Sequence, residues 1–221
     1  MSRRPARPTA PGAPVTPGGG PERFPGFDVM SQRPHWDPAT AAVVESRLGP
    51  PPAPRFFSPA EEAIATALLN LILGQDEEPR VPVTAMIDAR LAEAQTDGWR
   101  YADMPEDGRA WHGTLAYLDA DAEVKYAAGF AECPAADQRA LIQAVQDLGS
   151  GDWHGLPASR VWSLWTRYAC TAFYAHPWAW NEVGFPGPAY PRGYKNKGVG
   201  RREPFEMADG RPAEDPVREG E

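Results

Sequence analysis

Histidines are the side chains of this 221-residue sequence best suited to acid–base or metal chemistry; they are His35, His112, His154 and His176. His35 has Asp37 two positions away, but no third metal ligand lies nearby in the sequence. His112 falls on a predicted helix with Ala116, not a histidine or an acidic residue, one turn later. His154 lies in a glycine-rich loop and is expected to be solvated. His176 precedes a proline at a predicted helix end, where it would serve the last carbonyls.

Motifs for nucleophilic, phosphate and redox chemistry are absent from the sequence as well. It contains no GxSxG, no P-loop, no GxGxxG after a predicted strand and no CxxC. Cys170 lies in an apolar helical stretch and is predicted to be a core residue; whether it pairs with Cys133 stays open. Asp119 and Asp121 follow a predicted helix and are expected to shape its exit. The sequence therefore predicts a subunit with no catalytic centre, metal or cofactor of its own.

Charge and hydropathy argue against two further classes of function. Lys and Arg total 22 against 30 Asp and Glu, a formal net charge of −8, which disfavours binding to nucleic acid. The longest charge-free apolar stretch, residues 63–75, is shorter than the ~20 residues that a transmembrane helix needs. No hydrophobic region of a signal peptide follows Arg3 and Arg4. The compartment is left undetermined: cytoplasmic, or exported and membrane-associated only by way of a partner.

The elements that would position functional side chains lie between two proline-rich ends. Residues 1–22 are expected to form a disordered Pro/Gly-rich leader, and residues 23–57 an extended arm with a polyproline spacer. Residues 58–175 are predicted to form a helical bundle, residues 176–195 an aromatic C-terminal arm, and residues 196–221 a charged, disordered tail. The predicted fold class is all-α: a small helical bundle with long irregular N- and C-terminal arms.

Hydrophobic periodicity and capping signals define the helices of the bundle. The clearest begins with Ser58-Pro59-Ala60-Glu61, a capping box with proline at the first helical position, and ends at Gly74. Further helices are expected at about residues 82–94, 105–118 with a short turn to 126, 134–149 and 157–176. Because no stretch shows sustained alternation, no sheet beyond a stray strand pair is predicted.

The aromatic C-terminal arm is the least ordinary part of the sequence. Its prolines and glycines are predicted to forbid a helix, yet an exposed loop so rich in Trp, Tyr and Phe would be a large apolar patch. The arm therefore either folds back on the bundle, which we favour for Trp178 and Phe185, or lies on another protein. A small bundle has too little surface to cover both arms, and this favours a partner. The predicted partner-binding residues are Phe24, Phe27, Trp36, His176, Trp178, Trp180, Asn181, Phe185, Tyr190, Arg192 and Tyr194.

Three parts of the sequence resemble the gluconate 2-dehydrogenase subunit 3 family. They are FSPAE with LLNLIL at residues 57–73, the pair Ile87-Asp88, and the specific block TAFYAHPWAWNEVGF at 171–185 followed by GPAYPRGY at 187–194. The similarity covers about residues 24–194. The resemblance implies a small, cofactor-free subunit that stabilises or matures an FAD-binding dehydrogenase of the glucose-methanol-choline type and assists its export. That large subunit would oxidise a sugar, a sugar acid or a glycoside, and would often pass electrons to a cytochrome c subunit.

Two alternatives stay open at this point. A stand-alone hydrolase or lyase with a site near His176, Asn181 and Glu182 would turn over substrate without a flavoprotein. A self-associating structural protein, whose arms exchange between copies, would form a stable homodimer.

Overall fold

The computed structural model describes residues 15, 17, 24, 26–196, 198 and 201–208. The described chain is mostly helical, which confirms the predicted fold class. It divides into two compact units: an arm unit, within Met1–Gly49, Glu77–Pro79 and His176–Glu221, and a helical unit, Pro50–Asp76 and Arg80–Ala175. Most of the predicted leader, and the predicted tail beyond residue 208, lie outside the described residues. None of the described helices has the length and apolar character needed to span a bilayer.

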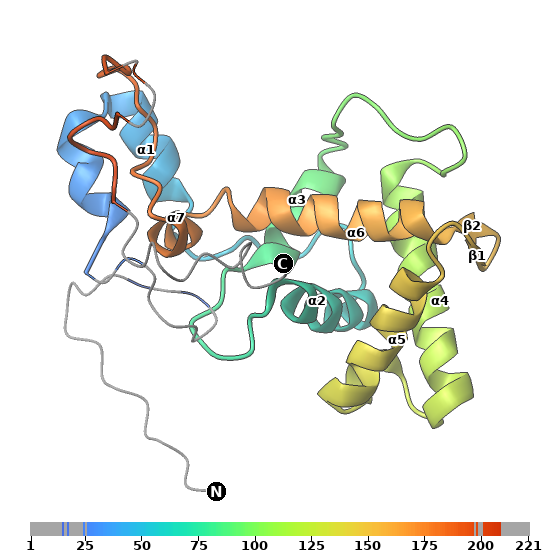
Figure 1. The fold of residues 1–221 in the computed structure, drawn as a ribbon. Helices are drawn as coiled ribbons and strands as arrows, with labels where there is room; N and C mark the ends of the chain where they lie inside the picture. The colour runs from blue at the N-terminus through green and yellow to red at the C-terminus, as the bar shows by residue number, and fades with distance from the viewer. Residues whose placement is uncertain are drawn as a thin grey trace, which may run out of the picture. The chain divides into compact units, whose positions relative to one another are not determined.

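The helical unit consists of helices and one small hairpin (Figure 1). Its helices are α2 (Pro59–Leu73), α3 (Val83–Ala92), α4 (Asp107–Tyr126), the 3-10 helix η2 (Phe130–Glu132), α5 (Ala135–Asp147) and α6 (Ala158–Phe173). Strands β1 (Asp152–Trp153) and β2 (Leu156–Pro157) pair antiparallel, with Trp153 opposite Leu156. This hairpin is the stray strand pair that the sequence allowed.

Local signals set most of the helix ends where the sequence predicts them. Ser58 caps α2 by accepting from the N–H of Glu61 at 3.3 Å, and the Glu61 carboxylate accepts from the N–H of Ser58 at 2.9 Å. Gly74 ends α2 in the left-handed conformation, at φ +65°. The predicted break at residue 118 is wrong, because α4 runs on to Tyr126. Ala122 is fully buried in that continuation, so packing extends the helix.

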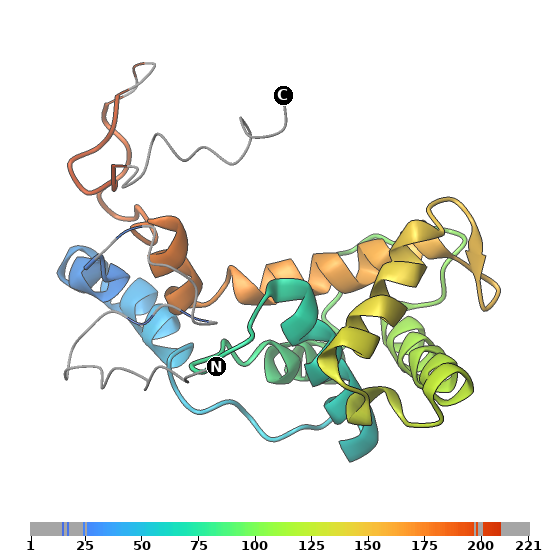
Figure 2. The ribbon, with the colours of Figure 1, turned by 60° about the horizontal axis from the view of Figure 1, so that its bottom comes forward.

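Helix α6 lies at the centre of the helical unit, as its apolar circumference predicts. It packs against α2, α3 and α5, and α5 also contacts α4 (Figure 2). Trp165 and Tyr168 of α6 are almost fully buried. The ring of Trp111 meets Tyr168 edge-on at a centroid distance of 5.7 Å, and the Trp165 indole donates to Thr114 Oγ1 at 3.1 Å. These contacts join α4 to α6 and close the core.

One buried carboxylate fixes the segment that leads into α2. Asp88 of α3 is 2% exposed and accepts hydrogen bonds from three successive backbone amides. The donors are Arg55 at 2.7 Å, Phe56 at 2.9 Å and Phe57 at 2.8 Å. These amides lie just before the first turn of α2, so Asp88 ties α3 to the start of α2.

The arm unit is built from both ends of the chain and contains helices where extended arms were predicted. These are the 3-10 helix η1 (Val29–His35), α1 (Pro38–Ser46) and α7 (Pro177–Val183). The prediction that proline and glycine forbid a helix after residue 175 is therefore wrong. Pro177 occupies the first helical turn, where no intrahelical N–H bond is lost, and Gly184 ends α7 at φ +67°. The N-terminal arm likewise contains the helices η1 and α1, whereas residues 47–57, with the predicted polyproline spacer, are not helical.

Candidate partner-binding site

The predicted partner-binding residues lie in the arm unit and divide by exposure. Those at most 7% exposed are Phe27, Trp36, His176, Trp180 and Asn181. Phe24, Trp178 and Arg192 are half-buried, and Phe185, Tyr190 and Tyr194 are 39%, 67% and 51% exposed. A partner can reach only the exposed and half-buried residues, so the buried ones serve to hold the arm unit together.

The buried residues join the two ends of the chain. Trp36 and Trp180 share one apolar cluster with Phe27 and with side chains of η1 and α1. Asn181 of α7 links the backbones, since its Oδ1 accepts from the N–H of Val29 at 2.8 Å and its Nδ2 donates to the carbonyl of Val15 at 3.1 Å. The side-chain amide of Asn181 is thus satisfied only when both ends of the chain are assembled.

His176 caps the N-terminus of α7. The prediction that it serves the last carbonyls of α6 is therefore wrong. Its Nδ1 accepts from the N–H of Trp178 at 3.2 Å, and its ring also hydrogen-bonds to the backbone of Arg47. The side chain is 2% exposed, and this burial lowers the pKa of His176 to about 4. The imidazole is therefore neutral near pH 7, which keeps Nδ1 available as the acceptor.

Acid is expected to destabilise the arm unit through His176. The unfolded chain has the ordinary histidine pKa of 6.5 and the folded chain a pKa of about 4, so between these values protons bind the unfolded chain preferentially. Stability is complete above pH 6.5 and is lost as the pH falls towards 4, which should appear as greater opening of α7 in hydrogen exchange at pH 5 than at pH 7. His176→Asn should flatten this pH dependence, whereas His35→Asn, at an exposed site in the same unit, should preserve it. A pH dependence that persists in His176→Asn would contradict the prediction.

Two glycines let the chain after α7 lie against the core of the arm unit. At Gly184, with φ +67°, a Cβ atom would stand 2.7 Å from the Phe24 ring. At Gly187, with φ +76°, it would stand 2.6 Å from the Trp36 ring. A side chain fits at neither place. This close approach fixes the backbone on either side of Phe185. The segment with the exposed aromatic residues is therefore anchored at its start.

Gly187→Ala is expected to destabilise the arm unit by about 2–5 kcal/mol. About 1–2 kcal/mol comes from the left-handed backbone and about 1–3 kcal/mol from overpacking against Trp36. Gly193→Ala is the matched control, because Gly193 has φ +69° but nothing within 4 Å of its Cβ position. Hydrogen exchange of the α7 amides measures both variants. Equal losses would show that contact with Trp36 contributes nothing.

The exposed tyrosines flank a turn that Arg192 braces. The N–H of Gly193 donates to the carbonyl of Ala189 at 2.8 Å, and Arg192 Nη1 donates to Gln32 Oε1 of η1 at 3.0 Å. Tyr190 and Tyr194 stand on either side of this arginine in the sequence. Exposed tyrosines beside an arginine match the composition of protein–protein interfaces.

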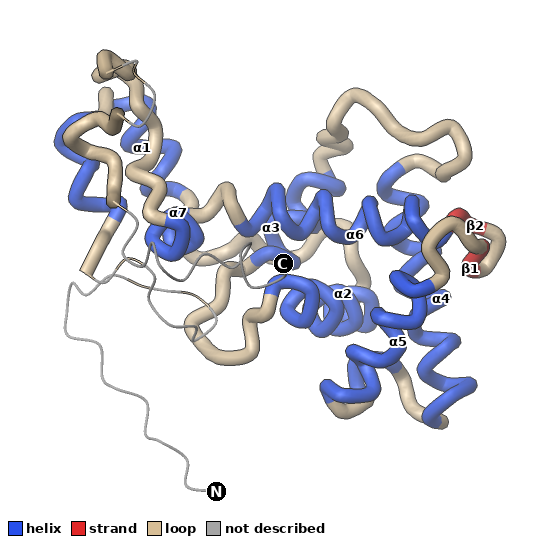
Figure 3. Tube along the Cα trace, in the orientation of Figure 1, coloured by secondary structure: helices blue, strands red, loops and turns tan. Residues whose placement is uncertain are grey.

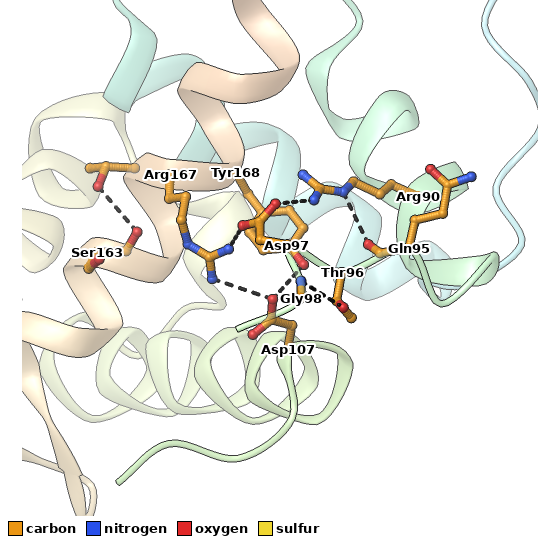
Figure 4. Close-up of polar contacts among 10 residues, drawn as sticks. Arg90, Gln95, Thr96, Asp97, Gly98, Asp107, Ser163, Arg167 and Tyr168 are labelled. Carbon is orange, nitrogen blue, oxygen red and sulfur yellow. Dashed lines mark hydrogen bonds and ion pairs between the residues drawn. The ribbon is translucent and has the colours of Figure 1, made fainter. Parts of the chain in front are cut away.

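The helical unit holds a polar cluster that sequence reasoning did not find (Figure 4). Asp97 pairs with Arg90 of α3 and with Arg167 of α6. Asp107 accepts from the Tyr168 hydroxyl at 2.7 Å and lies 3.4 Å from Arg167. Burial, together with the hydrogen bond to Asp107, raises the pKa of Tyr168 to about 12, so this phenol keeps its proton and donates.

This cluster fixes the loop of residues 93–106 between α3 and α4, drawn as a long tan segment in Figure 3. A cavity of about 530 Å³ lies along the loop and the start of α4, with Leu91, Trp99 and Arg109 in its wall. Trp99 is half-exposed, and the Arg167 guanidinium stands 5.0 Å from its ring centroid. The Asp and Arg side chains of the cluster pair with one another, and these pairs position the loop.

His154 is not simply solvated, as was predicted, but helps to fasten the hairpin to α4. Its ring stacks on Tyr117 at a centroid distance of 4.6 Å, and its Nε2 lies 2.8 Å from Asp121 Oδ1. Asp121 Oδ2 accepts from the Trp153 indole at 2.8 Å. Asp119 and Asp121 both lie within α4, so the prediction that they follow a helix is wrong. Asp119 accepts from the N–H of Phe130 at 2.7 Å.

The two cysteines are unpaired with each other, and the residues His112 and Asp37 make contacts at helix N-termini. Cys170 is exposed, which contradicts the predicted core position, and Cys133 is buried; both are free thiols. His112 Nδ1 lies 2.6 Å from Glu61 Oε1 in the capping box of α2. Asp37 caps α1 through the N–H of Thr40 at 2.8 Å. Within the described ranges, no three His, Cys, Asp or Glu side chains are grouped to hold a metal ion.

The residues of the alternative catalytic site near His176 and Glu182 make contacts within the arm unit. His176 is committed to capping α7, and both ends of the Asn181 amide bind backbone groups. Glu182 is half-buried, and burial raises the pKa of its carboxyl group. Among the hydrogen bonds described for this part of the chain, none joins Glu182 to His176.

A family model described as gluconate 2-dehydrogenase subunit 3 matches residues 59–187. No curated protein and no solved structure matches the chain. The matched range begins at the first residue of α2 and ends at Gly187, the glycine packed against Trp36.

Proposed function

Because the chain belongs to the gluconate 2-dehydrogenase subunit 3 family, we propose that it is the non-catalytic accessory subunit of an FAD-dependent dehydrogenase. The partner is a flavoprotein of the glucose-methanol-choline type that binds FAD and oxidises a sugar, a sugar acid or a glycoside. In complexes that also contain a cytochrome c subunit, the cytochrome takes up the electrons from the flavoprotein. The present chain binds the flavoprotein and stabilises or matures it.

The observation that carries this proposal is the exposed aromatic segment after α7. Phe185, Tyr190 and Tyr194 are exposed, while Gly184 and Gly187 fix the backbone at the start of the segment. A surface that is ordered before binding loses less conformational entropy when a partner docks. Tyrosine also offers a large contact area with few rotatable bonds, which suits an interface.

Co-expression tests the proposal. The flavoprotein proposed as the partner is produced with and without this chain, and three properties are compared: soluble yield, flavin absorbance per mole of protein, and sugar oxidation with an artificial electron acceptor. We expect all three to fall when the accessory chain is omitted. Equal yield, flavin content and activity of the flavoprotein alone would overturn the proposal. Substrate turnover by the purified accessory chain alone would overturn its non-catalytic role.

A further inference from the structure

The stretch from residue 192 to residue 202 is basic, although the chain as a whole is acidic. It contains no Asp or Glu, whereas the whole sequence has a formal net charge of −8. Its basic residues are Arg192, Lys195, Lys197, Arg201 and Arg202. A cluster of one sign attracts a surface of the opposite sign and orients it during association. The stretch begins two positions after the exposed Tyr190 and includes Tyr194, so it adjoins the proposed interface.

Arg192 has incomplete hydrogen bonding. Its Nη1 donates to Gln32 Oε1, but its Nε and Nη2 are buried and have no acceptor among the described residues. Buried donors are nearly always satisfied in proteins, so an unpaired pair calls for an explanation. The N–H groups of Nε and Nη2 lie side by side on one edge of a guanidinium, where they fit the two oxygens of a carboxylate.

The Phe205 ring stacks on the Arg192 guanidinium but offers no hydrogen-bond acceptor to Nε and Nη2. The Phe205 ring centroid lies 3.9 Å from Arg192 Cζ. The segment that carries Phe205 is tied down by Glu203, whose carboxylate accepts from the N–H groups of Lys195 and Asn196. The chain's own residues 201–208 thus stack on the guanidinium but leave two of its nitrogens without an acceptor.

We infer that Arg192 binds a carboxylate on an acidic surface of the flavoprotein partner, and that Phe205 is a cover which the partner displaces. The inference rests on the proposed function and adds to it the chemistry of the face that the partner presents. The carboxylate supplies acceptors to Nε and Nη2, and the exposed Lys195, Arg201 and Arg202 of the same stretch draw the acidic surface towards them. Tyr190 and Tyr194 border the pair and shield it from water.

The test is the affinity of the full-length chain for the purified flavoprotein subunit, measured by biolayer interferometry at low and high salt. Arg192→Lys keeps the charge but loses the two-pronged donor, so binding should weaken by about tenfold. Phe205→Ala removes the cover and should strengthen binding severalfold. Arg109→Lys, at an exposed arginine of the helical unit, is the matched control and should bind like the wild type. Circular dichroism confirms that each variant keeps its helix content.

The possible results distinguish failure of the inference from failure of the proposed function. Wild-type affinity in Arg192→Lys overturns the inference, and the proposed function stands as long as the flavoprotein still binds. Weaker binding by Phe205→Ala overturns the role of Phe205 as a cover. No binding by the wild-type chain overturns the proposed function itself. Phosphatidylglycerol vesicles test an anionic membrane as the other source of negative charge: binding to these vesicles, and not to the flavoprotein, makes the inference wrong.

Discussion

Replacing Asp88 with alanine is expected to lower the free energy of unfolding of the helical unit by about 3–5 kcal/mol. The carboxylate accepts from the amides of Arg55, Phe56 and Phe57, and no side chain remains to replace it in Asp88→Ala. Backbone donors that lose their acceptor in a buried setting bear the cost of desolvation. The segment before α2 should then detach, and the contact of Phe57 with Trp111, at a centroid distance of 6.0 Å, should be lost.

Urea denaturation followed by far-ultraviolet circular dichroism measures this loss. Asp88→Asn keeps one oxygen acceptor and should lie between the wild type and Asp88→Ala. Asp76→Ala removes a carboxylate whose ion pair with Arg139 is exposed, so it should change the free energy of unfolding by less than about 1 kcal/mol. If Asp88→Ala were no more destabilising than Asp76→Ala, the carboxylate would not hold the approach to α2.

The double variant Tyr190→Ala with Tyr194→Ala is expected to bind the flavoprotein at least about 100-fold more weakly than the wild type. Each side chain is more than half exposed, and a tyrosine at an interface hot spot contributes about 2 kcal/mol or more. Neither side chain belongs to the apolar cluster around Trp36 and Trp180, so the fold should persist. Trp180 itself is unsuitable as a probe, because it is 6% exposed and its removal would damage the arm unit.

The matched control for this variant is Trp99→Ala with Val124→Ala. These side chains are 50% and 89% exposed and belong to the helical unit. The control should retain the wild-type affinity and the wild-type flavin content of the complex. Comparable weakening in both double variants would show that apolar surface in general, and not the segment after α7, drives association.

Sequence reasoning succeeded where the signals are local. The capping box at Ser58 and the glycine at residue 74 set the ends of α2 through contacts within a few positions. It failed at α7 because Pro177 was interpreted only as the end of α6. The same sequence holds a start signal in His176-Pro177 and a stop signal in Gly184, but a seven-residue helix needs tertiary packing to be stable. That packing is the contact of Trp180 with the N-terminal segment.

The candidate site was predictable in composition but not in exposure. That Trp180 is buried and Tyr190 exposed follows from the pairing of Val29 with Asn181, which stand 152 positions apart. No local pattern encodes such a pairing. The polar cluster around Asp97 was unpredictable for the same reason, since Arg167 reaches it from a distant helix.

The arm unit forms only after synthesis of both ends of the chain, because Val29 near one end pairs with Asn181 near the other. A ribosome delivers Trp36 long before it delivers Trp180 and Gly187, the residues that complete its surroundings. A prematurely terminated polypeptide therefore displays a bare indole that holdases and proteases can recognise, whereas the completed one conceals it. Tyr190 and Tyr194 follow Gly187 in the sequence. A polypeptide that ends before Gly187 therefore also lacks the tyrosines proposed to bind the partner.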